Sequence, residues 1–385
     1  MEIDFSVHFF QIADCEAELR EARQGAISGL IMAGFTKQRR FLERTRDAKK
    51  VMVLDLGFLG DTVQTLPALW LVRQAYPEAE LHFAVEQNVI SLLECAPWVD
   101  RVWGYPRFPK HATLRQNLTM VARLRREKFD VLINLNGSDR SSWLTFLSGA
   151  GERLGRLPRD GGPIFWRQMF TEIVEHSSLA EPSYVQKCRC LEKAGFPFTR
   201  AEFHVETKPV HLQAAGIIPE DAGTYFHLSP FTTADNKELP PEQLLDLIGE
   251  LESRFPEKRL VISSAPTERE GRKMEKLLAG LTRKPWKVFA GELTLVQLAA
   301  VIQHCALHLC GDTGTLHLAL MTGAAAVSWF RPNPGMRMWI PVGGQYRTIV
   351  GTSSPEEKYL NGIQTAELVE SVFSVLENLR GKVVP

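Results

Sequence analysis

The stretch that most constrains the fold is a short apolar run followed at once by two glycines and a helical pattern. Residues 51–56 read Val-Met-Val-Leu-Asp-Leu, which is short enough for a buried strand, and residues 62–75 carry apolar side chains at helical spacing. Gly57 and Gly60 therefore lie in the turn, where glycine lets the backbone bend sharply or approach a ligand closely. The order predicts an α/β fold whose chemistry lies at the carboxyl ends of parallel strands.

Asp61 is the carboxylate that follows this turn. It falls at or near the helix N-cap, where aspartate is a favoured residue. From this segment alone, a capping role and a chemical role explain Asp61 about equally well.

A second segment, residues 305–319, repeats the plan of strand, glycine-containing turn and helix start. Its helix is expected to begin near Thr313, which leaves the amides of Thr313, Gly314 and Thr315 without helical partners. A helix N-terminus carries about half a positive charge and is suited to bind phosphate.

Together the two segments resemble the ADP-heptose:lipopolysaccharide heptosyltransferases, glycosyltransferase family 9. That family reads Leu-Gly-Asp followed by Pro-Ala near the start, and Asp-Ser/Thr-Gly-x-x-His-x-Ala near the end. The matching positions here are Leu59-Gly60-Asp61 with Pro67-Ala68, and Asp312-Thr313-Gly314 with His317 and Ala319. Further landmarks are Asn134-Leu135-Asn136-Gly137 with Arg140, Arg153-Leu154-Gly155, Lys237 before Pro240, and Gly291-Glu292-Leu293-Thr294. The likeness covers residues 50–350 and leaves the first 48 unmatched.

The resemblance implies a GT-B fold, in which two Rossmann-like parallel-sheet domains face a central cleft, and an inverting sugar transfer without a metal. It implies no cofactor, only an ADP-sugar as donor substrate. The alternation of strand-like and helix-length segments favours the same parallel sheets. Strands are expected at 51–56, 81–85, 99–104, 129–135, 225–230, 260–265, 286–291, 305–310 and 324–330.

The expected organisation has four parts. Residues 1–48 form an N-terminal helical extension, 49–207 the acceptor domain, 208–355 the nucleotide-sugar domain, and 356–385 a C-terminal helix that crosses back to the first domain. The linker is placed within 206–223, a stretch without a clear strand that contains prolines and glycines. The extension either docks on an anionic membrane surface or packs on the first domain or on another subunit.

Several function classes are disfavoured. The first turn reads Gly-Phe-Leu-Gly and lacks the G-x-G-x-x-G pattern of dinucleotide enzymes, so the nucleotide is expected in the second half. Forty-five basic and 45 acidic residues cancel, which gives no global field for nucleic acid. The six cysteines lack zinc-type spacing, and neither a signal peptide nor a membrane-spanning run of ~20 apolar residues is recognisable. A cytoplasmic protein is expected, with possible peripheral contact at the inner membrane.

The catalytic candidates are Asp61 and Lys237. Deprotonation of an acceptor hydroxyl needs a carboxylate within hydrogen-bonding reach, which is the role given to Asp61. Lys237 lies in a polar loop after strand 225–230, on the correct sheet edge to stabilise the departing diphosphate. The plainer alternative for Lys237 is a solvated loop lysine.

The donor candidates are Thr232, Thr233, Glu292, Asp312, Thr313, Gly314, Thr315 and His317. Like charges repel, so Asp312 is expected to accept hydrogen bonds from sugar or ribose hydroxyls or to cap its helix. Glu292 could hold ribose hydroxyls, or simply place a charge favoured by a helix dipole. His317 either touches phosphate, orients Asp312 or is a packed core histidine.

The acceptor candidates are Gly60, Arg107, Lys110, Arg115 and Arg140. A basic loop over 105–116 suits a phosphorylated glycolipid, whereas the charges over 117–128 are taken as a solvated helix face. The function predicted is transfer of a heptose-like sugar from ADP-heptose to a hydroxyl of a surface glycan or glycolipid. The alternatives are a transferase for another nucleotide sugar, a GT-B epimerase, which the basic loop disfavours, and a degenerate protein that only binds nucleotide sugars.

Overall fold

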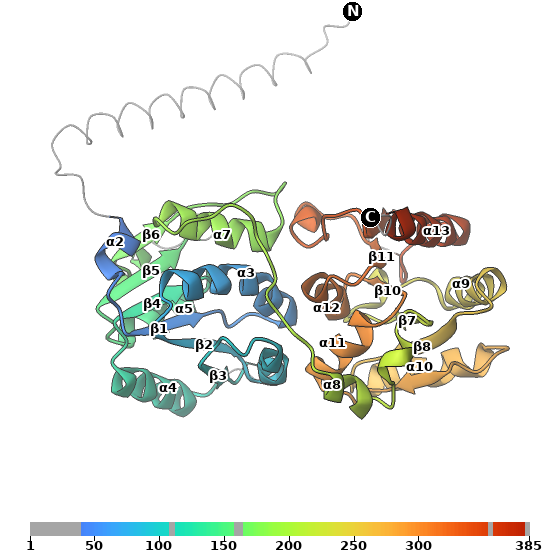
Figure 1. Ribbon diagram of the computed structural model, residues 1–385, viewed down its shortest axis with the longest axis horizontal. Helices are drawn as coiled ribbons and strands as arrows, with labels where there is room; N and C mark the ends of the chain where they lie inside the picture. Colours follow the sequence, from blue (N-terminus) through green and yellow to red (C-terminus); the bar gives the residue numbers. More distant parts are fainter. Residues whose placement is uncertain (1–39, 108–111, 158–164, 353–356, 382–385) are drawn as a thin grey trace, which may run out of the picture.

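The computed structural model describes residues 40–107, 112–157, 165–352 and 357–381. Within them, two six-stranded sheets lie side by side, and all strand pairs in both are parallel (Figure 1). Each sheet is built from one continuous stretch of chain, residues 50–174 and 225–350. The expected α/β architecture of two Rossmann-like domains is confirmed.

The first sheet has the strand order β3-β2-β1-β4-β5-β6. Its strands are β1 (Lys50–Leu54), β2 (Glu80–Glu86), β3 (Arg101–Tyr105), β4 (Val131–Asn134), β5 (Glu152–Arg156) and β6 (Glu172–Val174). The central strand β1 pairs with β2 and β4, so that Val53 lies opposite both Phe83 and Ile133. Helices cover both faces, as the near-continuous apolar runs of the central strands require.

The helices of this half are α2 (Phe41–Thr45), α3 (Leu59–Ala75), α4 (Leu114–Glu127), α5 (Asp139–Leu147), α6 (Trp166–Met169) and α7 (Ser183–Lys193), with the 3₁₀ segment η1 (Gln87–Cys95). Helix α3 is buried along most of its length, because it packs against β2, α7 and, from the other half, α12. Most of its buried side chains are apolar, and the polar side chains of Thr62, Gln64 and Thr65 are buried as well.

The second sheet has the strand order β12-β11-β10-β7-β8-β9. Its strands are β7 (Tyr225–Ser229), β8 (Arg259–Ser263), β9 (Lys287–Phe289), β10 (Leu307–Gly311), β11 (Ala326–Phe330) and β12 (Tyr346–Val350). The helical segments are α8 (Pro209–Ala214), η2 (Pro219–Asp221), η3 (Asp235–Lys237), α9 (Pro241–Arg254), α10 (Glu268–Gly280), α11 (Leu295–Gln303), α12 (Gly314–Thr322), η4 (Met336–Met338) and α13 (Thr365–Gly381). In both sheets the strand order reverses between two neighbours, β1 and β4 in one and β7 and β10 in the other, and ligands of such sheets bind at these points.

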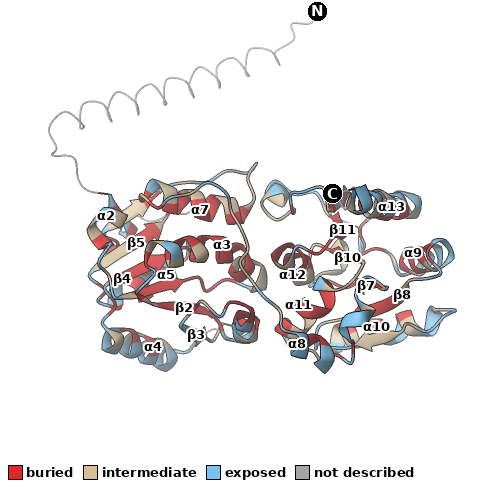
Figure 2. Cartoon of the chain, viewed as in Figure 1, coloured by how far each residue is buried: buried red, intermediate tan, exposed pale blue. Residues whose placement is uncertain are grey.

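The two halves share an apolar core. One cluster of buried side chains includes Val63 and Leu66 of α3 together with Leu316 and Leu320 of α12. Figure 2 shows buried segments of α3, α11 and α12 facing the junction. The chain passes between the halves after α7: Glu206 still donates its amide to the Cys95 carbonyl, and Thr207 hydrogen-bonds to Gln303 of α11.

The C-terminal helix corrects one expectation. Helix α13 packs against α9, β11 and β12, and its apolar residues Leu368, Val369, Val372 and Val375 belong to the core of the second sheet. The apolar face of α13 is buried against the second domain, so the expected crossing back to the first domain is wrong for the described part of this helix.

The expected N-terminal extension is described only in part. Residues 1–39 lie outside the described residues, and residues 40–48 contain α2. No helix among the described residues is long and apolar enough to cross a membrane.

Candidate functional site

A cleft of about 790 Å³ lies between the carboxyl ends of the two sheets. The turn after β1 contributes one wall, and the loops after β7, β8, β9 and β10 contribute the other. Of the candidates above, the residues that line it are Gly60, Asp61, Thr233, Lys237, Asp312, Thr313, Gly314, Thr315 and His317. The fold therefore brings together candidates from both halves of the chain.

Asp61 lies in the first turn of α3, which begins at Leu59 with Phe58 as N-cap. Its Oδ2 accepts a hydrogen bond from the Phe58 amide at 2.9 Å, so the carboxylate supports the helix start from the third helical position. Gly57 is required beside it, because a Cβ there would lie 2.1 Å from the Cβ of Asp61. Burial and then the negative charge of Asp55 raise the pKa of Asp61, which makes it a better proton acceptor.

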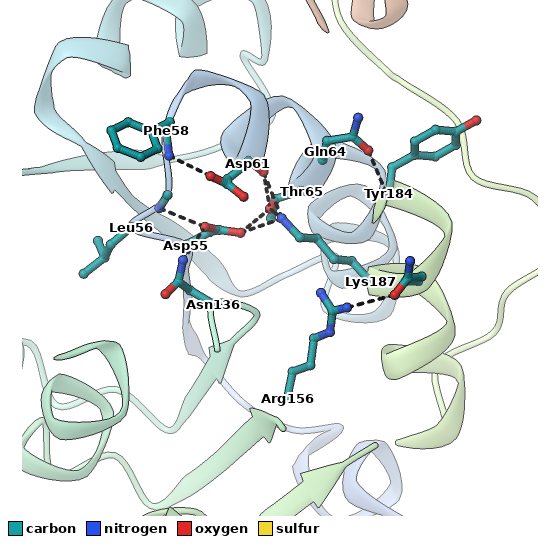
Figure 3. Close-up of polar contacts among 12 residues, drawn as sticks. Asp55, Leu56, Phe58, Asp61, Gln64, Thr65, Asn136, Arg156, Tyr184 and Lys187 are labelled. Carbon is teal, nitrogen blue, oxygen red and sulfur yellow. Dashed lines mark hydrogen bonds and ion pairs between the residues drawn. The ribbon is translucent and has the colours of Figure 1, made fainter. Parts of the chain in front are cut away.

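A buried polar network lies beneath Asp61, and sequence reasoning missed it (Figure 3). Asp55, at the end of β1, and Lys187, from α7, form an ion pair of 2.7 Å with side chains 0% and 3% exposed. Thr65 and Asn136 also donate to Asp55. The one signal in the sequence was a carboxylate within an apolar strand-like run; nothing marked Lys187 as its partner.

Lys237 and Asp312 face one another on the second-domain side. Lys237 ends the short segment η3 after β7, Asp312 follows β10, and the ammonium lies 2.6 Å from Asp312 Oδ2. Both side chains are partly exposed to the cleft. This pairing partly neutralises Asp312 and lowers its repulsion of an anion beside it.

The loop that presents Lys237 is fixed by a second group of charges. Arg269 and Lys273 of α10 form ion pairs with Asp235 and Glu238, on either side of Lys237. The hydrogen bonds from Lys273 and then Arg269 lower the pKa of Asp235 to about 2. The Lys237 main chain therefore lies between two charge-paired residues, which holds it at the cleft.

The N-terminus of α12 opens on the same wall. The helix begins at Gly314 with Thr313 as N-cap, and no side chain caps it. Because the first amides of a helix have no intrahelical acceptor, those of residues 313–315 present donors to the cleft. The expected helix start near Thr313 agrees with the structure.

Two donor candidates, Thr232 and Glu292, do not line the cleft. Thr232 is 1% exposed, and its hydroxyl donates to the Ala234 carbonyl, so it shapes the loop instead of lining the cleft. Glu292 is exposed and is not part of the cleft wall, although its neighbours Gly291 and Leu293 are.

His317 lines the cleft and also connects the two halves of the chain. The imidazole is 6% exposed, its Nδ1 lies 3.2 Å from Gln64 Nε2 of α3, and burial lowers its pKa to about 4. A Cβ at Gly60 would lie 2.7 Å from the same ring. Gly60 is therefore needed for close contact between the halves, a role that the acceptor assignment did not include.

The acceptor candidates are dispersed. Arg107 lies next to the Asp61 turn, with its guanidinium 4.3 Å from the Phe58 ring centroid and a hydrogen bond to the Leu56 carbonyl. Arg115 lines a separate hollow of about 450 Å³ beside β3 and α4, and Arg140 lies in the first turn of α5. Neither lines the main cleft, and Lys110 lies outside the described residues. Across the described ranges, no group of three or more His, Cys, Asp or Glu side chains is arranged to hold a metal ion.

Comparison with known proteins identifies the family to which this chain belongs. The family model for glycosyltransferase family 9 (heptosyltransferase) matches residues 118–364. Lipopolysaccharide heptosyltransferase 3 of Escherichia coli is 22% identical over 342 residues, which cover 83% of this chain and 97% of that protein.

Solved structures agree. A family 9 glycosyltransferase from Veillonella parvula superposes with a TM-score of 0.73 at 18% identity, covering 86% of this chain and 98% of that one. The E. coli ADP-heptose lipopolysaccharide heptosyltransferase II superposes with a TM-score of 0.69 at 16% identity, covering 87% and 100%. The chain belongs to glycosyltransferase family 9, the heptosyltransferase family, and is a glycosyltransferase with the GT-B fold.

Proposed function

We propose that this enzyme transfers a heptose from ADP-heptose, with inversion, to a hydroxyl of a lipopolysaccharide-type glycolipid. The observation that carries the proposal is a single cleft with a carboxylate of raised pKa on one wall and a lysine with a helix N-terminus on the other. The names of the relatives supply the sugar, the nucleotide and the class of acceptor. A glycolipid acceptor would have the enzyme work at the cytoplasmic face of the inner membrane.

Asp61 is the proposed general base. Its Oδ2 is used by the Phe58 amide, and within the described residues no side chain or amide donates to Oδ1, which is left for an acceptor hydroxyl. As the acceptor oxygen forms its bond to the anomeric carbon, the hydroxyl proton passes to Asp61. The bond from that carbon to the diphosphate breaks on the opposite face, and one displacement of this kind inverts the configuration.

The second domain is proposed to receive the leaving diphosphate. Its negative charge grows as the glycosidic bond breaks, and donors already in place stabilise that charge most effectively. Lys237 supplies the cation, and the α12 amides supply further donors. Asp312 keeps the lysine oriented and is available to accept a hydrogen bond from a donor hydroxyl. In this scheme neither a metal nor a cofactor takes part.

The test combines calorimetry with turnover. The purified protein is titrated with ADP, UDP, GDP and NAD, and transfer from ADP-heptose to a lipopolysaccharide core acceptor is measured for wild type and Asp61→Asn. Asparagine still accepts the Phe58 amide, so the helix start is preserved while the base is lost. We expect selective ADP binding in both proteins and turnover reduced by about 10² or more in the variant, the usual loss for a general base.

A matched control is Asp47→Asn, the same substitution at a side chain that is 89% exposed. Its turnover is expected to equal that of wild type. Unchanged turnover in Asp61→Asn would reduce Asp61 to a helix-capping residue. Preference for UDP or GDP would keep the fold and change the donor, and binding of no nucleotide would point to a degenerate scaffold.

A further inference from the structure

We propose that the buried ion pair Asp55–Lys187 positions the candidate base, with Lys187 fixing the main chain at Asp61 and Asp55 holding an ionised carboxylate beneath it. The inference rests on the proposed function, because it concerns the base of that reaction. Neither residue lines the cleft, so both act through Asp61 and are positioning residues.

Lys187 donates to three oxygens of the Asp61 turn (Figure 3). Its Nζ lies 2.7 Å from Asp55 Oδ2, 2.6 Å from Thr65 Oγ1 and 2.9 Å from the Asp61 carbonyl oxygen. An ammonium has three protons, so its donor capacity is fully used. The helix turn that presents the Asp61 carboxylate is thus hydrogen-bonded directly to α7.

Asp55 connects the two strands at the point where the strand order reverses. Its Oδ1 accepts from the Gly57 amide at 3.0 Å and from Asn136 Nδ2, after β4, at 3.1 Å, and its Oδ2 accepts from Thr65 and Lys187. The carboxylate therefore holds the start of the turn, the first helical turn of α3 and the loop after β4 in one arrangement. A catalytic group held in this way keeps its geometry without reorganisation during the reaction.

Stability alone does not explain the pair. Removing two charges from water costs about as much as their attraction returns, and an apolar pair of similar volume often stabilises a protein equally well. The chain nevertheless places both charges directly under the carboxylate at the cleft. A second contact joins the same two helices, since Gln64 of α3 accepts the Tyr184 amide at the start of α7.

The charges of Asp55 and Lys187 also change the pKa of Asp61. Burial opposes ionisation of Asp55, but the attraction and hydrogen bond of Lys187 hold the pKa of Asp55 below its ordinary value. The resulting anion raises the pKa of Asp61, and its effect exceeds the opposing effect of Lys187. The groups that face Asp61 are Asp55 and Lys187 below it, Arg107 and the Phe58 amide beside it, and His317 with the Lys237–Asp312 pair on the same cleft.

Asp55→Asn tests the charge with little change of shape. Asparagine has one acceptor oxygen, which can keep the hydrogen bonds from Gly57 and Asn136, while its amide group then takes the place of the oxygen that faces Lys187 and Thr65. Loss of the Asp55 charge removes one of the causes that raise the pKa of Asp61, so this pKa falls. Asp61 then becomes a weaker base, and we expect kcat to fall about tenfold with the ADP dissociation constant unchanged.

Lys187 is tested in the Asp55→Asn background, because Lys187→Met alone would leave a buried anion without a partner and endanger the fold. Asp55→Asn/Lys187→Met removes the hydrogen bond to the Asp61 carbonyl, and a displaced catalytic group costs a further tenfold or so in kcat. The control is Lys50→Met, the same substitution at the opposite end of β1, where Lys50 pairs with Glu127. Its kcat should stay at the wild-type value.

A second readout does not depend on turnover. The Phe58 amide donates to Asp61, so its NMR shift follows the titration of that carboxylate, and Asp61→Asn should abolish the titration. We expect a lower midpoint in Asp55→Asn than in wild type. An unchanged midpoint with unchanged kcat would overturn the role of Asp55, and equal kcat in the single and double variants would overturn that of Lys187. If wild type transferred no heptose, the proposed function would fall, while the titration would still decide whether the pair acts on Asp61.

Discussion

The second sheet contains a pair of histidines that should make its folding sensitive to acid. His227 of β7 and His308 of β10 are both 0% exposed, and their Nδ1 atoms lie 2.8 Å apart. Burial lowers the pKa of His308 from its ordinary 6.5 to about 3, and burial together with the neighbouring His308 lowers that of His227 as well. Both rings are therefore neutral in the folded protein near pH 7.

The direction in which stability changes with pH follows from the number of protons bound by the folded and unfolded chains. The unfolded chain binds protons at these histidines near pH 6.5, whereas the folded chain does not, so unfolding takes up protons below that pH. Stability is fully present above pH 6.5 and is lost as the pH falls from 6.5 towards 3. Each pH unit in that window costs about 1.4 kcal/mol per histidine, so His308 alone should cost about 2 kcal/mol at pH 5.

Urea unfolding near pH 7 and near pH 5 measures this loss. His308→Gln removes one titrating group. The slope of its unfolding free energy against pH should therefore be smaller than that of wild type by about 1.4 kcal/mol per pH unit, the contribution of one proton. Ser229→Ala is the control: Ser229 pairs with Ser263 in the same sheet but does not titrate, so it should lower stability without changing the slope. Equal slopes for wild type and His308→Gln would refute the reasoning.

Four further outcomes are expected. Gly60→Ala places a methyl group against the buried His317 ring and should lower the melting temperature, since overpacking costs about 1–3 kcal/mol and the helix gains at most about 1 from alanine. Gly314→Ala meets only the flexible end of Leu59 and should shift the melting temperature less; a larger shift would contradict this account of the junction. Lys237→Ala should weaken ADP binding at least tenfold in calorimetry, and wild-type affinity would exclude a phosphate role. Transfer activity should survive excess EDTA, whereas loss restored by a divalent cation would refute the metal-free scheme.

The sequence predicted the central strands β1, β4, β7 and β10 but only one edge strand of each sheet, β3 and β9. The runs at β1, β4, β7 and β10 are apolar because helices cover both faces of these strands, and such runs are recognisable without a structure. Strands β5, β6 and β12 were not predicted. Glu152–Arg156 reads Glu-Arg-Leu-Gly-Arg and is half-buried, and β6 and β12 are edge strands with partly exposed side chains, so none carries the apolar signal.

The site residues that directly follow an apolar central strand could be predicted from the sequence. Asp61, Lys237 and Asp312 lie after β1, β7 and β10, and strand ends of parallel sheets converge on one edge. The partner of Asp55 was not predictable, because Lys187 is 132 positions away and reaches Asp55 only through the packing of α7 on α3. Thr232 looked like its neighbour Thr233, and only the folded loop separates the buried hydroxyl from the one at the cleft.

Because each sheet is built from one unbroken stretch of chain and α13 stays with the second, the enzyme divides near residue 207 into two contiguous modules. Recombination between family members at that point would exchange the proposed acceptor half and the proposed donor half as whole units. A recombined enzyme would need a histidine at the position of His317, because that ring packs against Gly60 and lies next to Gln64 where the two modules contact one another. If the first module binds the acceptor as proposed, changes of acceptor during evolution would accumulate in it, with the junction residues constrained by both modules.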